Sequence, residues 1–413
     1  MGPILIFDKS FLQALNPDEA VWLDQFFLTN ITPVFFIETL ADLEKEVHKG
    51  RTPEQIVGNL AAKTPDLHSR PNMHHRSLLA GELARGDRIE MSVGRPIISG
   101  GRHTELEGRS GVVFETAPEE EALNRWQAGR FLDLERQQAK AWRRDLSLIS
   151  PERQREMLSG WFGSARPRSL EQIKALTDAV IDNNNREETF VFGMALLGIA
   201  PVAQGEVLER WRRAGQPPLG VFAPYFRHLF GVDLFFYLGL SSDLISSRRT
   251  NKIDLAYLYY LPFCMVFTSS DKLHAATVPL FMRSNQTFVP GPELKADLGA
   301  LDRHFDSLSE EVKLRGVYAF ASRPPVDSAF LVTRLWDQHM SPRWREHAMR
   351  APTPRNPERQ AALVELIKKQ AAAPASGDET KSADELDYMI ITRRVRLKKG
   401  KWKRFPPEVK PDP

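Results

Sequence analysis

The segment 251–271 most constrains the fold of this chain, because it combines a helix, a turn, a short buried strand and a carboxylate in that order. Asp254 stands where a helix would begin, and the helix is predicted to end at Leu261, since a residue before proline disfavours helical backbone. The apolar run Cys264–Phe267 is too short for a helix and is typical of a strand buried on both faces of a parallel sheet. Asp271 follows that strand, at the edge where ligands bind in open α/β sheets.

The N-terminus repeats this order of elements. Ile4–Phe7 is an apolar run that predicts a first strand, followed directly by an acid, and a helix is expected over 17–28. Pro33–Phe36 then predicts a second strand, and the next acid is expected to open a helix over Thr39–Val47. Four acids therefore stand at predicted strand ends or helix starts: Asp8, Glu38, Asp254 and Asp271.

These acids lie in four short motifs, FDKS at 7–10, IETL at 37–40, IDL at 253–255 and FTSSD at 267–271. In this order the motifs resemble those of the PIN-domain nucleases, with Ser269 in place of the threonine that is usual in the family. The resemblance covers residues 1–48 and about 231–295. It implies a small parallel sheet that brings the four acids together, and the long separation of Glu38 from Asp254 implies a large insertion.

Four carboxylates that converge on one point repel one another, so a site of this kind needs a cation. Oxygen ligands suit Mg²⁺ or Mn²⁺ rather than zinc, and two such ions can promote hydrolysis of a phosphodiester. The resemblance implies the same chemistry. Three hydroxyls beside the acids are candidates for hydrogen bonds to the scissile phosphate: Ser10, Ser269 and Ser270.

The expected fold class is α/β, a PIN-like small parallel sheet flanked by helices, with a mostly helical insertion and a basic C-terminal tail. The nuclease domain is expected to be discontinuous, over 1–48 and 231–350, with the insertion over 49–230. In the insertion, strands are predicted at 88–93 and 111–116, joined by a flexible link at 96–103, and helices follow. A linker with one helix is expected over 351–387 and the tail over 388–413.

Composition narrows the class of protein. The chain has 413 residues, a formal net charge of +3 and one cysteine, Cys264, which excludes an internal disulfide and fits a reducing compartment. No apolar run approaches the roughly 20 residues that span a bilayer, and the N-terminus carries no signal-type apolar stretch. A cytoplasmic protein without a membrane partner is expected.

The positive charge is concentrated in the tail, where residues 393–404 carry eight cations and no acid. Cations interleaved with aromatic rings are typical of an arm that contacts phosphates and stacks on unpaired bases. A solvated tail, or a docking strand for a protein partner, is the alternative. The tail residues predicted to bind substrate are Arg393, Arg394, Arg396, Lys398, Lys399, Lys401 and Trp402.

Each signal also has a structural interpretation. Aspartate after a strand or before a helix is a common cap, so any one of the four acids can be structural. Asp42, one helical turn beyond Glu38, is either a further metal ligand or a surface acid. His274 is either a helper at the phosphate or a helical surface residue. The histidines His68, His74, His75 and His103 fit no zinc-finger spacing and are interpreted as surface residues rather than a zinc site.

Two functions from different classes follow. The first is a metal-dependent endonuclease, with RNA favoured over DNA because the resembled family leans that way, serving in RNA processing or as a regulated effector in defence against phage. The alternative is a non-catalytic PIN-like binding or scaffold protein that engages nucleic acid or a partner through the insertion and the tail. The insertion also offers a surface for a protein partner or a second copy of the chain.

Overall fold

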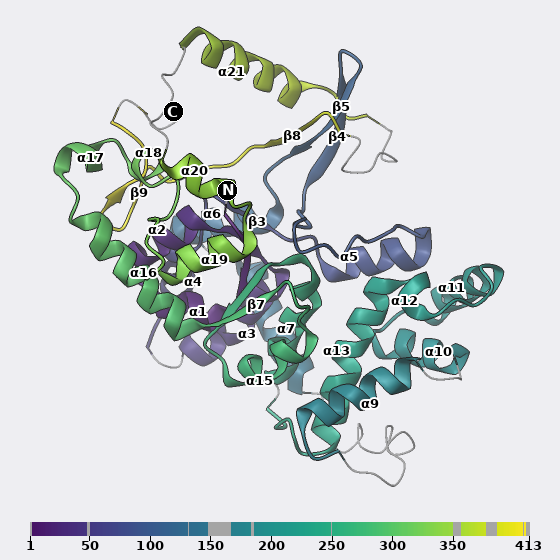
Figure 1. Ribbon diagram of the computed structural model, residues 1–413. Coiled ribbons are helices and arrows are strands. Elements are labelled where there is room, and N and C mark those ends of the chain that lie inside the picture. The colour runs from purple at the N-terminus through teal and green to yellow at the C-terminus, as the bar shows by residue number, and fades with distance from the viewer. Residues whose placement is uncertain are drawn as a thin grey trace.

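Five short strands form an all-parallel sheet at the centre of the molecule, in the order β3-β2-β1-β6-β7 (Figure 1). The computed structural model describes residues 2–47, 50–130, 132–147, 167–182, 186–248, 250–349, 357–376, 386–407 and 409. The two central strands come from distant parts of the chain, and Leu5 pairs with Val266. The strands are β1 (Ile4–Phe7), β2 (Leu28–Ile31), β3 (Ser69–Pro71), β6 (Val266–Ser269) and β7 (Thr287–Pro290). The predicted α/β class with a parallel sheet and flanking helices is therefore confirmed.

The second strand lies earlier in the chain than predicted. It is β2 at Leu28–Ile31, whereas Pro33–Phe36, predicted to be a strand, begins helix α3 (Pro33–Val47). A proline fits the first turn of a helix, where its missing N–H needs no partner. Glu38 therefore lies inside α3, in its second turn, and does not open a helix.

The central sheet also takes a strand from the segment assigned to the insertion. β3 (Ser69–Pro71) pairs in parallel with β2, so that Asn30 lies opposite Arg70. The central sheet therefore extends beyond the predicted boundary at residue 49, through helix α4 (Pro53–Lys63) to β3. The chain leaves this core only after β3.

A second, three-stranded sheet has the order β4-β5-β8. The strand predicted at 111–116 is present as β5 (Arg109–Phe114), but its partner is β4 (Gly101–Leu106), which overlaps the predicted flexible link and not the predicted strand at 88–93. Glu107 and Gly108 both have positive φ, 53° and 74°, as a two-residue hairpin turn requires. β8 (Tyr388–Ile391) adds to β5 from the far end of the chain.

Most of the other elements in the described chain are helices, and Figure 1 shows α9 to α13 grouped on one side of the molecule. The aromatic-rich α13 (Pro224–Ser241) is buried along most of its length. Pro262 does not end the helical segment before β6, since the chain continues as a 3-10 helix over Tyr257–Phe263. The other helical elements are α1 (Lys9–Ala14), α2 (Pro17–Phe26), α5 (His75–Ala80), η1 (Gly81–Arg85), α6 (Pro118–Gln127), α7 (Asp133–Ser147), α9 (Leu170–Asp182), α10 (Arg186–Leu196), α11 (Pro201–Arg213), α12 (Leu219–Phe222), α14 (Asn251–Ala256), α15 (Lys272–Phe281), α16 (Gly291–Asp306), α17 (Glu310–Leu314), α18 (Val317–Phe320), α19 (Leu331–His339), α20 (Arg343–Met349) and α21 (Pro357–Ala372).

The linker predicted over 351–387 is described only in part. Helix α21 (Pro357–Ala372) confirms the one helix expected there, whereas 351–356 and 377–385 lie outside the described residues. None of the helices that the structure describes is both long and apolar enough to cross a bilayer.

The basic tail folds back on the body of the protein as a hairpin. β9 (Lys398–Lys399) and β10 (Trp402–Lys403) pair around Gly400, whose φ is 55°. The Trp402 ring is buried edge-on against Trp22, with 4.9 Å between ring centroids. Residues 398–403 of the tail therefore form a hairpin packed against α2.

Asp24, on α2, anchors this hairpin. Its carboxylate is fully buried, accepts the backbone N–H groups of Asp66, Leu67 and His68, and pairs with Arg404. Burial alone would raise the pKa of Asp24, but Arg404 and Lys399 hold that pKa well below its usual range. The tail is therefore held to α2 by charges that water does not screen.

Replacing Arg404 by alanine is expected to destabilise the fold, because Asp24 would keep its buried charge with only Lys399, whose ammonium is 3.9 Å away. Breaking a buried pair by removing one partner costs about 3–5 kcal/mol. Urea unfolding followed by tryptophan fluorescence measures the change. Arg213→Ala, which removes an exposed helical ion pair with Glu209, is the control and should leave the midpoint unchanged; an equal effect of the two variants would contradict the anchor.

Candidate functional site

The parallel register of β1 and β6 brings two of the predicted acids to one edge of the central sheet. Asp8 follows β1 and Asp271 follows β6 one residue beyond Ser270, and the neighbouring ends pair as Phe7 with Thr268. In both cases the acid then starts a helix, α1 or α15. The carboxyl edge of the sheet is therefore the candidate site.

Asp8 is a buried carboxylate with a full set of donors. Its Oδ1 accepts the N–H of Phe11, which caps α1, and its Oδ2 accepts the hydroxyls of Ser10 at 2.6 Å and Ser269 at 2.7 Å. The whole residue is 3% exposed. Two of the predicted phosphate-binding serines are thus partners of Asp8, and the exposed Ser270 donates its backbone N–H to the Ser10 hydroxyl at 3.3 Å.

His274 is the counter-ion of Asp8. Its Nδ1 lies 3.4 Å from Asp8 Oδ2 and 2.8 Å from the Ser269 hydroxyl, and its Nε2 lies 2.6 Å from the Asp254 carbonyl oxygen. Burial would lower the pKa of His274, but the hydrogen bond and charge of Asp8 and the Asp254 carbonyl raise it to about 9. His274 in turn lowers the pKa of Asp8 against the effect of burial. The imidazole is a buried cation, and the predicted surface position is wrong.

Asp271 is held in place as a helix cap. Its Oδ1 accepts the backbone N–H of Leu273 at 2.6 Å and that of His274 at 3.4 Å, and its own N–H donates to the Ser269 hydroxyl. The structural interpretation of Asp271 therefore holds for one of its two oxygens. Among the described residues no donor bonds Oδ2.

Glu38 lies in α3, half-buried, and accepts a hydrogen bond from the Tyr257 hydroxyl at 2.7 Å. Burial raises the pKa of Glu38 to about 8; Lys9 and the tyrosine oppose this rise, whereas the charges of Asp254 and Asp8 add to it. Glu38 is thus protonated at neutral pH when the site holds no other cation.

Asp254 lies in the first turn of α14. Burial raises its pKa to about 7; the charge of His274 opposes the rise, and the charges of Asp271 and Asp8 add to it. Mutual repulsion therefore acts among all four predicted acids, in the sense expected for carboxylates that share one region.

The four acids do not form a ready-made cage. Among the described residues, no group of three or more His, Cys, Asp or Glu side chains has an arrangement that can hold a metal ion. The donor set is nevertheless all oxygen, which suits Mg²⁺ or Mn²⁺. Mg²⁺ keeps several waters and often uses only one or two carboxylates of the protein. The donor chemistry of these residues therefore suits such an ion, whereas their spacing among the described residues forms no group of three ligands.

Asp42 and the histidine group have other roles. Asp42 accepts a hydrogen bond from the buried Lys9, which also lies 3.7 Å from Glu46. His74 caps α5, and His75 stacks on it with 4.3 Å between ring centroids. The pKa of both histidines is lowered, chiefly by burial.

The remaining two histidines lie apart from each other in the fold. His68 bonds the Asp24 carbonyl at 2.9 Å, and His103 lies in β4. Neither belongs to a metal-binding group of three among the described residues.

Most predicted substrate-binding cations of the tail have partners inside the protein. The buried Lys399 donates to the Thr64 carbonyl at 2.9 Å, Arg396 pairs with Asp66, and Lys401 pairs with Asp302. Arg393 donates to the Leu67 carbonyl. The predicted role of Trp402 in base stacking is wrong for this conformation, because its ring is 4% exposed. Arg394 and Lys398 are exposed and have no side-chain partner in the described part of the chain.

Three residues of the site were missed or undervalued by sequence reasoning: Lys9, Tyr257 and His274. Tyr257 follows Asp254 by three residues, and His274 follows Asp271 by the same spacing, so each lies one turn from an acid. This spacing in the sequence could have indicated that both side chains lie near the acids. Lys9 gave none, because a cation beside an acid in the chain is usually solvated.

Protonation of Glu38 predicts a pH dependence of stability. Between its ordinary pKa of 4.5 and its folded pKa of about 8, the folded state holds the proton and the unfolded state does not. The free energy of unfolding therefore falls as pH rises through this window, by at most about 1.4 kcal/mol per pH unit for one group. Glu38→Gln should flatten the decline measured by urea unfolding from pH 5 to pH 8, and Glu209→Gln should not. An unchanged slope in Glu38→Gln would show that Glu38 is ionised in the fold.

Comparisons of this chain with protein-family models, with curated proteins and with solved structures find no match. Its function is therefore argued from its own residues: a buried ion pair of Asp8 and His274, two carboxyl groups of raised pKa, and a helix-capping Asp271, all at the carboxyl edge of one parallel sheet.

Proposed function

We propose that the chain is a metal-dependent endonuclease that hydrolyses phosphodiester bonds, with RNA favoured over DNA. The observation that carries this proposal is the placement of Asp8 and Asp271 at neighbouring strand ends of one parallel sheet, where both bond the Ser269 hydroxyl. The pKa of Glu38 and of Asp254 is raised, and the charges of neighbouring predicted acids contribute to this rise. Carboxylates that repel one another in a desolvated site attract a divalent cation, because the cation removes both the repulsion and the protons.

Asp8, Glu38, Asp254 and Asp271 are the residues that would hold Mg²⁺ or Mn²⁺, directly or through water. When bound, such an ion polarises a phosphoryl oxygen and lowers the pKa of water. Other side chains of the protein hold these acids in position. Ser269 donates to Asp8 at 2.7 Å and receives the N–H of Asp271 at 2.9 Å, so one hydroxyl fixes two of the acids.

His274 and Tyr257 hold protons at defined atoms. The imidazole joins Asp8 to the Asp254 carbonyl, which sets the distance between β1 and the start of α14. Tyr257 accepts the Lys9 N–H at 3.3 Å and donates to Glu38, which ties α3 to the same edge of the sheet. Both are positioning residues.

A non-catalytic binding protein is the second candidate function. It is favoured by the lack of a metal-ready group of three ligands among the described residues, and by His274, which already neutralises Asp8. In that case the same ion pair is purely structural, and the protein engages nucleic acid or a partner through the insertion or the tail without a metal.

The nuclease proposal predicts manganese-dependent cleavage of single-stranded RNA by the pure protein. Asp8→Asn and Asp271→Asn should each lower the cleavage rate by about 100-fold or more, because each removes a ligand and leaves a smaller negative charge for the ion. Gel analysis of end-labelled RNA measures the rate, with EDTA as the blank. Glu209→Gln, an exposed acid on α11, is the matched control. Cleavage that survives both Asp variants would refute the assignment.

Metal binding is also expected to stabilise the fold. A ligand at about 100 times its Kd adds roughly 2.7 kcal/mol to the free energy of unfolding. Since Glu38 and Asp254 must lose protons to bind the ion, the rise in melting temperature caused by Mn²⁺ should be larger at pH 8.5 than at pH 6. Asp8→Asn should remove it. If Mn²⁺ changes the midpoint of neither protein, the second candidate function takes first place.

A further inference from the structure

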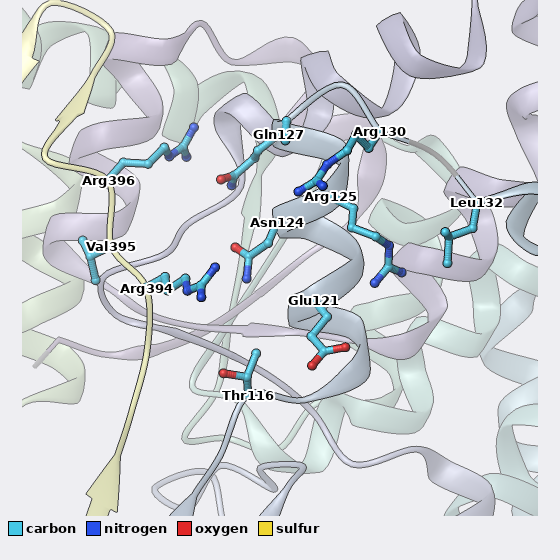
Figure 2. A pocket seen from close by; sticks show the side chains of 11 residues that line it. Thr116, Glu121, Asn124, Arg125, Gln127, Arg130, Leu132, Arg394, Val395 and Arg396 are labelled. Carbon is cyan, nitrogen blue, oxygen red and sulfur yellow. The ribbon is translucent and has the colours of Figure 1, made fainter. Parts of the chain in front are cut away.

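A hollow beside helix α6 is lined by four arginines. It has a volume of about 1030 Å³ and lies between α6, the loop that follows this helix, and residues 394–396 of the C-terminal segment (Figure 2). Organic ligands occupy pockets of roughly 300–1,000 Å³, so the hollow is far larger than a single inorganic anion requires. The arginines are Arg125, Arg130, Arg394 and Arg396.

Two of these arginines are fixed by the protein. Arg396 donates to Asp66 at 2.9 Å and to the Ala62 carbonyl at 3.0 Å. Arg125 pairs with Glu135 at 2.9 Å, while its buried Nε–H has no acceptor in the described part of the chain. These two side chains are preorganised, because their positions are set before any ligand binds.

The other two arginines carry charge that the described protein does not neutralise. Arg130 and Arg394 are exposed, and no described residue accepts a hydrogen bond from either guanidinium or forms an ion pair with it. Figure 2 shows the Arg394 guanidinium directed toward Asn124 on α6. Glu121 is the single carboxylate among the lining residues, so the hollow has an excess of positive charge.

Two amide side chains add neutral donors and acceptors. Gln127 donates its amide nitrogen to the Ala61 carbonyl at 3.1 Å, which holds the side chain at the wall of the hollow. The Asn124 side chain has no hydrogen-bond partner among the described residues. Guanidinium groups bind phosphate through paired N–H bonds, and amides bond the edges of nucleobases.

We propose that this hollow binds the phosphates of a nucleotide, either within a single strand or free. Arg394 and Arg130 would supply the charge that contacts phosphate, and Asn124 would contact the base or sugar. The site is separate from the acids at the sheet edge and needs no metal, so it does not rest on the nuclease proposal.

The test measures binding in EDTA, where the metal chemistry is silent. A fluorescent ten-nucleotide single-stranded RNA is titrated with the full chain by anisotropy, and a nucleoside triphosphate and inorganic phosphate serve as competitors. Arg394→Glu should weaken binding at least 10-fold, and for the strand it should reduce the slope of log K against log salt by about 0.7 for each phosphate that the variant no longer neutralises. Arg213→Glu makes the same change of charge at an exposed site on α11 and should have little effect.

The possible outcomes are distinct. Strand binding that the triphosphate does not compete for identifies a strand site, whereas efficient competition by the triphosphate identifies a free-nucleotide site; phosphate should compete poorly with either. No binding, or equal losses in Arg394→Glu and Arg213→Glu, overturns the proposal. Arg130→Glu is the second variant should Arg394→Glu fail to fold, as judged by thermal unfolding. Binding is measured in EDTA, without a divalent cation, so failure of the nuclease proposal leaves this result unaffected.

Discussion

The buried ion pair of Asp8 and His274 is the interaction on which the candidate site depends. A carboxylate with almost no exposure is tolerated only when a cation and hydrogen-bond donors replace its water. His274 supplies the charge, and Ser10 and Ser269 supply two donors to the same oxygen. Since the imidazole also bonds the Asp254 carbonyl, one contact joins the end of β1, the end of β6 and the start of α14.

This pairing divides the acids into two kinds. Asp8 stays ionised because His274 neutralises it, whereas Glu38 and Asp254 have no such cation close enough to overcome burial. Lys9, whose charge opposes the rise in the pKa of Glu38, forms its ion pairs with Asp42 and Glu46 on α3. At neutral pH Glu38 therefore holds a proton, and Asp254 is close to the midpoint of its titration. Any cation that binds there must displace protons, which couples its affinity to pH.

The sequence was most informative where a short apolar run ends on a polar residue. This pattern located β1 and β6 and the two acids that follow them. It failed at Val34–Phe36, because a buried helix turn and a buried strand have the same apolar composition, and only the packing of α3 on the sheet decides between them. Pro33 and the preceding run Leu28–Ile31 favoured the observed order, although the signal was weak. The apolar pattern also gave no sign of β3, because this strand is only three residues long and reads Ser-Arg-Pro.

The tail shows what local patterns cannot reveal. Eight cations in twelve positions are typical of a nucleic-acid arm, yet Asp24, Asp66 and Asp302, all distant in sequence, neutralise most of those that the hairpin buries or half-buries. A run of cations therefore predicts ligand binding only where the fold brings no acids to neutralise it. The cations that can bind an external ligand are those without an ion pair inside the described protein, and Arg394 is one of them. The paired cations hold the C-terminal segment in place, and this segment positions Arg394 opposite α6. The shape of the hollow therefore depends on the ion pair of Arg404 with Asp24.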